Sequence, residues 1–498
     1  MDHVGHFIDN ASIDGPEDTR SPVYNPSTGA IERTVGLATP AMLDRALESS
    51  LRGAKAWSAT SLSKRAEVLF SFRQLVADNA DTLAEAVAIE HGKTLADAAG
   101  EVARGLENIE FATGLMTLLK GSHAGEVSTG IDVRAERYPV GVVAGITPFN
   151  FPAMVPLWMA ANALACGNAF LLKPSEKDPS ASLLLAKLGA EAGLPPGAFN
   201  VLHGGAEVVG SLLEDPRINA ISFVGSTPVA RSIFQRGTAS GKRVQALGGA
   251  KNHMVVLPDA ELDGAADAAI SAAYGSAGER CMAVSVVVAV GDIADSLVSA
   301  IASRMLALRI GPSLDPNSEM GPLVTQVHRD RVAGYLDIAA SEGASVVVDG
   351  RKHVLQEGSA SGFFLGPSLI DHVDASMQVY RDEIFGPVLC VVRAKTFDEA
   401  VSIVNANPYG NGVAIFTRDG GAARRFERSV EVGMVGVNVP VPVPVASFSF
   451  GGWKDSLFGD THIYGPSGID FYTRWKVTTS RWPDPGSSSI DLGFPQTR

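Results

Sequence analysis

The chain has 498 residues, of which 46% are hydrophobic and 19% charged, and this composition is typical of a globular α/β enzyme. One hydrophobic core does not grow to this length, so we expect two or three domains. The 54 acidic and 41 basic residues give a net charge of -13, which argues against nucleic acid or an anionic membrane as a general partner.

No run approaches the roughly 18 apolar residues of a membrane span, and residues 1–19 lack the apolar core of a secretory signal. The three cysteines, Cys166, Cys281 and Cys390, are odd in number, far apart and without metal-ligand spacing. We therefore expect a reducing, cytoplasmic location and no metal site. Cys166 and Cys390 lie in apolar runs and are interpreted as inert packing residues.

Residues 40–120 predict successive amphipathic helices, the first starting at Thr39-Pro40, the second at Ser61 or Ser63, and the fourth spanning about 99–120. The polar alternation of residues 121–140 then predicts an exposed hairpin. Its free edge favours pairing with another subunit.

From Val140 onward, short apolar runs alternate with helical segments near 154–166, 180–193, 206–214 and 227–236. This rhythm predicts a parallel, doubly wound sheet that binds a nucleotide at the carboxyl ends of its strands. A GxGxxG fingerprint is absent. The nearest equivalent is the turn Gly225-Ser226-Thr227, where the N–H groups at a helix start could hold a phosphate, although many such turns serve geometry alone.

A second α/β series follows from about residue 252, with helices near 262–275, 293–308, 326–342 and 397–405. The proline-alternating residues 437–446 predict an extended connection, because proline cannot donate to a sheet. Residues 468–482 alternate again and are expected to pair with the 121–140 hairpin. We expect a first domain formed by 1–120 and 140–246, a second domain at 247–462, oligomerisation segments at 121–139 and 463–482, and a flexible tail at 483–498.

Cys281 is the candidate nucleophile, because it follows a small-residue turn (275–278) and precedes a β-branched run, at the mouth of a strand. The alternative is a small apolar core residue. Glu279 and Arg280 speak against it, since a core position does not tolerate unpaired charges. An adjoining arginine should also favour the reactive thiolate.

Several blocks in order along the chain resemble the aldehyde dehydrogenase superfamily: PFNFP (148–152), KPSE (173–176), FVGST (223–227), GERC (278–281), EIFGPV (383–388) and NPYGNGVAIFT (407–417). Within that superfamily the chain is most similar to the CoA-acylating methylmalonate-semialdehyde dehydrogenases, over residues 5–482. The resemblance implies an α/β fold of two doubly wound parallel-sheet domains with a small β oligomerisation flap. It also implies a homotetramer built as a dimer of dimers, although the sequence leaves dimer and tetramer open.

In such an enzyme, Cys281 adds to the aldehyde carbon, a hydride leaves to NAD, and a thioester remains. The resemblance assigns stabilisation of the oxyanion to the Asn150 amide and the Cys281 N–H. It places Thr147, Phe149 and Gly248 near the nicotinamide, Lys173, Glu176 and Lys177 near the adenine ribose, Ser226 at the pyrophosphate, and Glu383 with Phe385 at the nicotinamide ribose. Glu176 favours NAD over NADP, because a carboxylate repels a 2′-phosphate.

Hydrolytic relatives carry a water-activating glutamate four residues before the lysine of their Gly-Gly-Lys block, and counting back from Lys251 gives Leu247. Leucine accepts no proton, so the thioester is expected to await CoA as co-substrate. The resemblance also implies that Arg104 and Arg280 hold the substrate carboxylate, although Arg104 alone reads as a solvated charge. Decarboxylation would then yield propionyl-CoA from methylmalonate semialdehyde and acetyl-CoA from malonate semialdehyde.

Two alternatives stay open: a hydrolytic dehydrogenase of another carboxylated aldehyde, and a catalytically silent protein of the same fold, against which Cys281, Asn150, Lys173 and Glu383 speak. The sequence reveals no CoA-binding motif. It separates neither valine from inositol breakdown nor one semialdehyde from the other.

Overall fold

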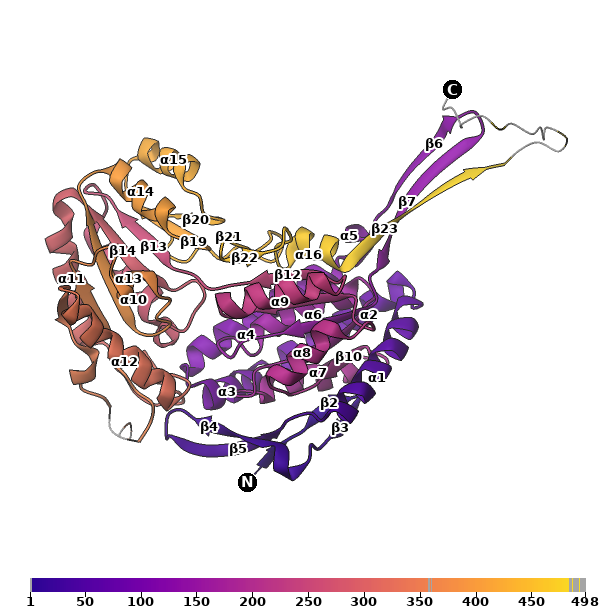
Figure 1. Cartoon of the computed structure of the whole chain (residues 1–498), viewed down its shortest axis with the longest axis horizontal. Coiled ribbons are helices and arrows are strands. Elements are labelled where there is room, and N and C mark those ends of the chain that lie inside the picture. Colours follow the sequence, from indigo (N-terminus) through magenta and orange to yellow (C-terminus); the bar gives the residue numbers. More distant parts are fainter. Residues whose placement is uncertain (1, 357–358, 360, 483–485, 487–491, 493–498) are drawn as a thin grey trace.

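The computed structural model describes residues 2–356, 359, 361–482, 486 and 492, so most of the predicted tail at 483–498 lies outside the described residues. Two α/β lobes, each built on a largely parallel sheet, stand side by side, and a narrow three-stranded arm projects from the first (Figure 1). No helix in the described ranges is long and apolar enough to cross a membrane.

The first lobe is built on an eight-stranded sheet with five parallel strands, while the pairings at its edges, β22 with β12, β2 with β10 and β3 with β2, are antiparallel. The central strands are buried on both faces, as their near-continuous apolar runs predict. In sheet order the strands are β22 (Leu457–Phe458), β12 (Arg243–Leu247), β11 (Ala220–Val224), β8 (Val142–Ile146), β9 (Ala169–Lys173), β10 (Phe199–Val201), β2 (His6–Ile8) and β3 (Ala11–Ile13).

Helices cover both faces of this sheet, and alternate strand residues feed two separate apolar clusters. One face packs on α2 (Leu62–Asp78), α3 (Ala80–His91), α4 (Leu95–Thr113), α5 (Leu115–Leu118), α6 (Met154–Ala165) and α7 (Ser180–Glu191). The other packs on α1 (Pro40–Ser58), α8 (Ala206–Glu214) and α9 (Thr227–Ala239).

The second lobe carries a seven-stranded sheet that is parallel except for its edge strand β15. In sheet order the strands are β15 (Ser345–Val348), β16 (Ser368–Asp371), β17 (Val388–Ala394), β14 (Val284–Val290), β13 (Asn252–Val256), β19 (Gly412–Phe416) and β20 (Met434–Val437). Its helices are α10 (Leu262–Tyr274), α11 (Ala294–Ala307), α12 (Gln326–Ser341), α13 (Gln378–Arg381), α14 (Phe397–Ala406) and α15 (Gly420–Ser429).

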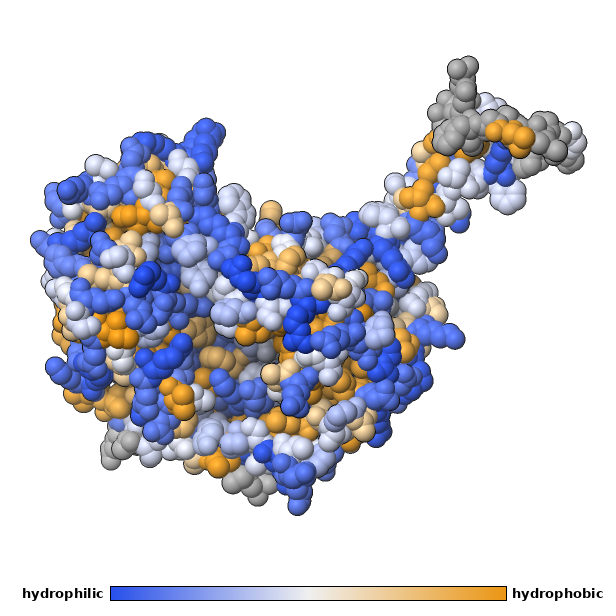
Figure 2. Space-filling model, in the orientation of Figure 1, coloured by the Kyte–Doolittle hydropathy of each residue, from blue (hydrophilic) through white to orange (hydrophobic). Residues whose placement is uncertain are grey.

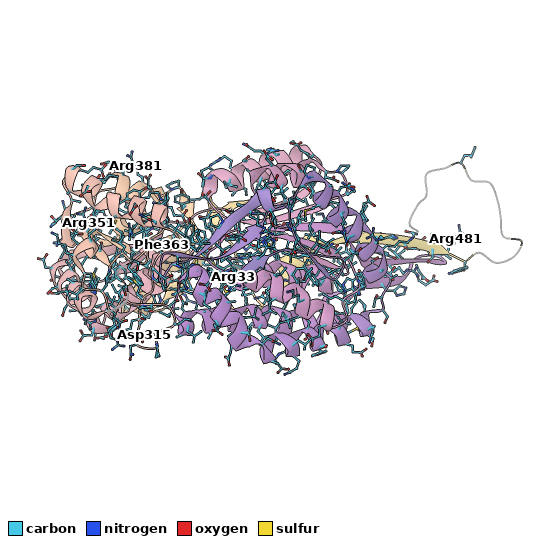
Figure 3. All side chains as sticks on the ribbon, turned by 90° about the horizontal axis from the view of Figure 1, so that it is seen from below. Arg33, Asp315, Arg351, Phe363, Arg381 and Arg481 are labelled. Atoms are coloured by element: carbon cyan, nitrogen blue, oxygen red, sulfur yellow. The ribbon has the colours of Figure 1, made fainter. Side chains whose placement is uncertain are left out.

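A small N-terminal sheet of β1 (Asp2–Val4), β5 (Ala30–Gly36) and β4 (Arg20–Asn25) connects the two lobes. The loop after β4 meets the second lobe, where the Phe363 N–H donates to the Pro26 carbonyl over 2.8 Å and the Tyr24 ring packs edge-on against Phe363. Figure 3 shows Phe363 at the boundary of the lobes, close to the strand that bears Arg33.

The arm consists of β6 (Ser122–Ser128), β7 (Ile131–Pro139) and β23 (Thr473–Arg481), with β7 in the middle. The predicted pairing is confirmed: β23 runs antiparallel to β7 from Thr473 opposite Pro139 to Arg481 opposite Ile131. The expected strand at 468–472 is wrong, because α16 (Gly465–Tyr472) occupies these residues. Figure 2 shows patches of apolar surface along the arm. The exposed side chains of β23 include Trp475 and Val477.

Two further differences concern the last third of the chain. Helix α15 was not predicted, because it begins with Gly420-Gly421 and glycine has a low helix propensity. Asp419 nevertheless caps it by accepting a hydrogen bond from the N–H of Gly421. Residues 457–458, expected in the second domain, form β22 and pair with β12 of the first sheet. The proline-rich segment has no strand between residues 438 and 446, as expected, and two short strands, β18 (Tyr409–Gly410) and β21 (Trp453–Lys454), flank it.

Candidate active site

A cavity of about 620 Å³ lies between the carboxyl edge of the first sheet and the second lobe. The first lobe contributes the loops that follow four parallel strands, β8, β9, β11 and β12, and the second contributes Cys281, α12 and residues 381–385. Loops at this edge of a parallel sheet form the ligand site of open α/β folds. Eight of the predicted site residues line it: Phe149, Asn150, Lys177, Ser226, Gly248, Cys281, Glu383 and Phe385.

The loop before Cys281 has a strained backbone that requires small residues. It forms the 3-10 turn η2 (Gly275–Gly278), in which Ser276 and Ala277 have φ angles of 54° and 50°. A Cβ on Gly278 would lie 2.2 Å from the carbonyl oxygen of Gly386, so backbone packs directly on backbone here. The turn thereby fixes Cys281 against the loop that carries Glu383.

Two buried asparagines hold the backbone of the candidate nucleophile Cys281. The side-chain amides of Asn252 and Asn411 both donate to the Cys281 carbonyl, over 2.9 and 3.1 Å. Both come from strand ends in the second lobe, and sequence reasoning missed them. Their only signal was polarity next to buried strands, as in NHMVV and NPYGNGVAIF.

Arg280 favours the Cys281 thiolate, as expected, but other influences outweigh it. Burial, and after it the nearby Glu383 carboxylate, raise the pKa of the Cys281 thiol to about 12, although backbone hydrogen bonds and Arg280 act in the opposite direction. The Arg280 guanidinium instead pairs with Asp97 of α4 over 2.6 Å. Residues adjacent in sequence therefore need not present their side chains to one another.

Glu279, whose charge was taken as an argument against a core position here, is fully buried. One carboxyl oxygen lies 3.4 Å from the N–H of Val324 and 3.4 Å from His328, and the other lies 3.8 Å from His91. Burial raises the pKa of Glu279 to about 8. Its partners come from segments far away in sequence, which a local pattern cannot reveal.

Asn150 is 3% exposed, and within the described residues its hydrogen bond from Lys93 goes to its backbone carbonyl and none involves its side-chain amide. It lines the same cavity as Cys281. Phe149 beside it packs on His91, His328 and Phe385 at ring separations of 5.9 to 6.3 Å. An unengaged donor held next to a nucleophile is the arrangement an oxyanion site needs.

The other residues on the cavity wall include the predicted turn at the start of α9. Ser226 is its exposed N-cap residue, and Thr227 accepts a hydrogen bond from the Gly249 N–H through its side chain over 2.8 Å. Glu383 accepts from the Ala250 N–H over 2.8 Å, and burial raises the pKa of its carboxyl to about 7. Lys177 lies over the Phe149 ring, 4.5 Å from its centre.

Three predicted cofactor residues do not line this cavity. Thr147 is buried, with a hydroxyl that has no partner in the described part of the chain, and its N–H donates to the Lys173 carbonyl. The Lys173 ammonium lies 3.4 Å from Glu176. This pair stands at the end of β9, beside the cavity wall and not in it.

Comparison with known proteins matches the family model described as "Aldehyde dehydrogenase family" over residues 13–478. The chain belongs to the aldehyde dehydrogenase family. It is 53% identical to a malonate-semialdehyde dehydrogenase of Pseudomonas aeruginosa, covering 98% of this chain and 99% of the relative. It is 47% identical to a malonate-semialdehyde dehydrogenase of Geobacillus thermodenitrificans, covering 96% and 98%.

Two solved structures superpose closely. The methylmalonate-semialdehyde dehydrogenase of Oceanimonas doudoroffii has a TM-score of 0.95 at 50% identity. A Sinorhizobium meliloti protein assigned to the same activity, and complexed with NAD, has a TM-score of 0.96 at 50% identity. Each alignment covers 98% of this chain and 99% of the other. The predicted aldehyde dehydrogenase fold, family and oxidoreductase class are confirmed.

Against this family background, the end of β12 is apolar. Leu247 is 3% exposed and belongs to the hydrophobic cluster on which Cys281 packs, and Ala246 before it is buried on the other face. The carboxyl groups that line the cavity are those of Asp382 and Glu383. Asp382 accepts from the Tyr335 hydroxyl over 2.9 Å, which leaves Glu383 as the carboxyl close to Cys281.

The two arginines predicted to bind substrate already have partners. Arg104 donates to Glu107 over 2.6 Å and to the Pro444 carbonyl over 2.7 Å, whereas Arg280 pairs with Asp97. Asp97 and Arg104 stand seven residues apart on α4, which places both guanidinium groups along one face of that helix. Each guanidinium has five donors, so donors remain for a carboxylate. Neither side chain lines the large cavity.

Proposed function

We propose that this enzyme oxidises malonate semialdehyde and methylmalonate semialdehyde with NAD and transfers the acyl group to CoA. Malonate semialdehyde, NAD⁺ and CoA would give acetyl-CoA, CO₂ and NADH, and the methyl homologue would give propionyl-CoA. The names of relatives that are 47 to 53% identical support the substrate class. Acyl transfer to CoA is supported by the residues beside the nucleophile.

The reaction begins when the Cys281 thiol loses its proton and its sulfur bonds to the aldehyde carbon. Negative charge then develops on the aldehyde oxygen, where the Asn150 amide and the Cys281 N–H donate to it. Each such donor contributes roughly 3 to 4 kcal/mol to the barrier reduction. Collapse of the adduct expels the hydride and leaves an acyl thioester on Cys281.

Bound NAD supplies the acceptor for that hydride. The cavity fits it in three respects: a helix N-terminus at Ser226 for a phosphate, aromatic walls at Phe149 and Phe385, and a carboxyl at Glu383 for ribose hydroxyls. The solved relative in complex with NAD supports the same assignment.

The single observation that carries the CoA step is the apolar end of β12. Leu247 and Ala246 can neither accept a proton nor orient a water molecule, so general-base hydrolysis lacks its agent at this position. A thioester that water attacks slowly persists until the CoA thiol displaces Cys281. Loss of CO₂ from the 3-carboxylate completes the reaction, with the carboxyl group held by Arg104 and Arg280 until then.

Hydrolysis of the thioester is the second candidate, and Glu383 favours it. Its carboxyl has a pKa of about 7 and lies near Cys281, so it could accept a proton from water near neutral pH. The product would then be a free acid, and CoA would have no role.

One experiment separates the two candidates: NADH formation from malonate semialdehyde, with and without CoA, with the acyl product identified by mass spectrometry. We expect one equivalent of NADH per site followed by slow turnover without CoA, and sustained turnover with acetyl-CoA as product when CoA is present. Undiminished turnover to a free acid without CoA would replace the first candidate by the second.

We also propose a homo-oligomer, a homotetramer formed as a dimer of dimers, assembled through the arm. Strands β6 and β23 are both edge strands of the arm, and Trp475 and Val477 expose 52% and 63% of their surface on it. A projecting sheet with free edges and exposed aromatic residues is suited to pair with another copy. Sedimentation of the Trp475→Glu variant tests this: we expect smaller particles, and an unchanged mass would refute a role of the arm.

A cytoplasmic location is proposed on the cysteine chemistry. All three thiols are free, and Cys166 and Cys390 are buried as predicted, where burial raises the pKa of both. A nucleophilic thiol survives best in a reducing compartment. Fractionation of the source cells tests this location.

A further inference from the structure

Lys93, in the corner between α3 and α4, is a buried lysine that none of the steps above uses. Its side chain is fully buried, and its ammonium donates to the Glu101 carboxylate over 2.7 Å and to the backbone carbonyl of Asn150 over 2.7 Å. Burial of two charges is costly unless geometry and hydrogen bonds compensate. Here both groups are paired, so the arrangement specifies where the Asn150 backbone lies.

Glu101 on α4 holds the other end of the same loop. Its second carboxyl oxygen accepts from the N–H of Ala153 over 2.8 Å and from the N–H of Met154 over 3.1 Å, at the start of α6. A carboxylate at a helix N-terminus satisfies donors that the helix itself leaves free. The Lys93–Glu101 pair therefore binds residues 150 and 153–154 from one side.

The aromatic residues on either side of Asn150 are held by the same corner. The Lys93 ammonium lies 4.1 Å from the centre of the Phe151 ring, and the His91 ring stacks on Phe149 at 5.9 Å. The Asn150 side chain itself has no hydrogen bond in the described ranges, so its direction depends on its backbone. The corner between α3 and α4 thus controls the backbone from which the Asn150 amide projects.

We infer that Lys93 and Glu101 are positioning residues for the oxyanion donor Asn150. This inference rests on the proposed role of Asn150. A donor stabilises a developing oxyanion only if its position is fixed before reaction, and a displacement of about 1 Å costs on the order of 100-fold in rate. The pair contacts the loop at its backbone and at the Phe151 ring, and of the loop residues that it contacts only Asn150 lines the cavity. Its loss should therefore affect acylation through Asn150.

The test is a double-mutant cycle on the rate of the first NADH equivalent from malonate semialdehyde without CoA. We expect Asn150→Ala to slow this step by about 100- to 1,000-fold and Lys93→Met by about 10- to 100-fold. In the Asn150→Ala background, Lys93→Met should then cost no more than about twofold. An equal cost in both backgrounds would mean that Lys93 acts elsewhere and would overturn the inference.

Alkylation of Cys281 by iodoacetamide provides the second measurement, because this reaction forms no oxyanion. In Lys93→Met, iodoacetamide should alkylate Cys281 at a rate within about twofold of that in the unsubstituted protein. Formation of the first NADH equivalent, the burst, should nevertheless be slow in this variant. Loss of both rates in parallel would indicate a general collapse of the site and would refute a positioning role. Lys93→Arg, which keeps charge and donors, should recover part of the burst rate.

Lys242→Met is the matched control. Lys242 is also buried and also donates to backbone carbonyls, including that of Ile218 over 3.0 Å, but it lies at the amino end of β12. It should lower the melting temperature without slowing the burst. If Lys93→Met does not fold, Glu101→Gln takes its place in the cycle with the same expected coupling. A burst rate unaffected by Asn150→Ala would instead contradict the proposed role of Asn150. The inference about Lys93 and Glu101 would then fall with it.

Discussion

Titration of the Cys281 thiol in the free enzyme tests the electrostatics of the site most directly. With the pKa raised from 9.0 to about 12, the thiolate fraction at pH 8 falls from about one tenth to about 10⁻⁴, a loss of about 1,000-fold. A more basic thiolate is intrinsically more nucleophilic, which recovers roughly 20-fold for three units of pKa. We therefore expect iodoacetamide to react about 50-fold more slowly with Cys281 than with an ordinary thiol at pH 8.

Glu383 makes this prediction specific. The ionised carboxyl of Glu383 raises the pKa of the Cys281 thiol, and the pKa of Glu383 itself is about 7. Glu383→Gln should therefore speed alkylation at pH 8, and it should leave the rate nearly unchanged at pH 6, where the native side chain is already neutral. Arg280→Met should act in the opposite direction, and Glu207→Gln, an exposed carboxyl on α8, should do nothing.

The assay is the pseudo-first-order alkylation rate between pH 6 and 11, followed by mass spectrometry of the peptide that contains Cys281. The rate should rise without a plateau over most of this range. A plateau below pH 9 in the free enzyme, or slower alkylation in Glu383→Gln, would refute the account of burial and charge given for the thiol.

Three further predictions concern catalysis and stability. Cys281→Ala should abolish NADH formation, and steady-state turnover in that variant would exclude the thioester route. Arg104→Ala and Arg280→Ala should each raise KM for malonate semialdehyde by at least tenfold more than for propionaldehyde, and an equal effect on both aldehydes would contradict the carboxylate clamp. Burial raises the pKa of Glu279 from 4.5 to about 8. As the pH rises between these values, Glu279 ionises in the unfolded chain before it ionises in the folded protein. The free energy of unfolding therefore falls over this range, by up to about 4 to 5 kcal/mol. Glu279→Gln should therefore show a smaller fall in melting temperature from pH 6 to pH 8 than the native protein, and an identical fall would count against the raised pKa.

The parts of the fold that were predicted correctly are those with a local physical cause. Thr39 and Ser61 start α1 and α2 because each side chain accepts a hydrogen bond from the first turn, as their position before an apolar period indicates. Strands β8, β9 and β11 were recognisable because both faces are buried. Helix α16 was mistaken for a strand because five residues, 468–472, are too few to separate the two periodicities.

The predictions about the site also divide into features with a local signal in the sequence and features without one. Cys281 and Asn150 were predicted from motifs, and both line the cavity. Asn252, Asn411 and Lys93 were missed, because each acts on a backbone carbonyl supplied by a distant part of the chain. The raised pKa of the Cys281 thiol could not be predicted for a related reason: burial and Glu383, 102 residues away in sequence, outweigh the adjoining Arg280, whose own partner is Asp97.

Leu247 connects the raised thiol pKa with the proposed CoA step. It packs in the hydrophobic cluster that Cys281 contacts, so the apolar surroundings that deny a base to water are part of the surroundings that desolvate the thiol. Exclusion of water protects a thioester from hydrolysis and, by the same physics, disfavours the thiolate that must form it. A chain that carried a carboxylate at this position would gain a base for water and place a second negative charge near the sulfur. Under the proposed function, slow hydrolysis of the thioester and a raised thiol pKa are therefore both consequences of the apolar surroundings to which Leu247 belongs. A substitution of Leu247 that changes one should change the other.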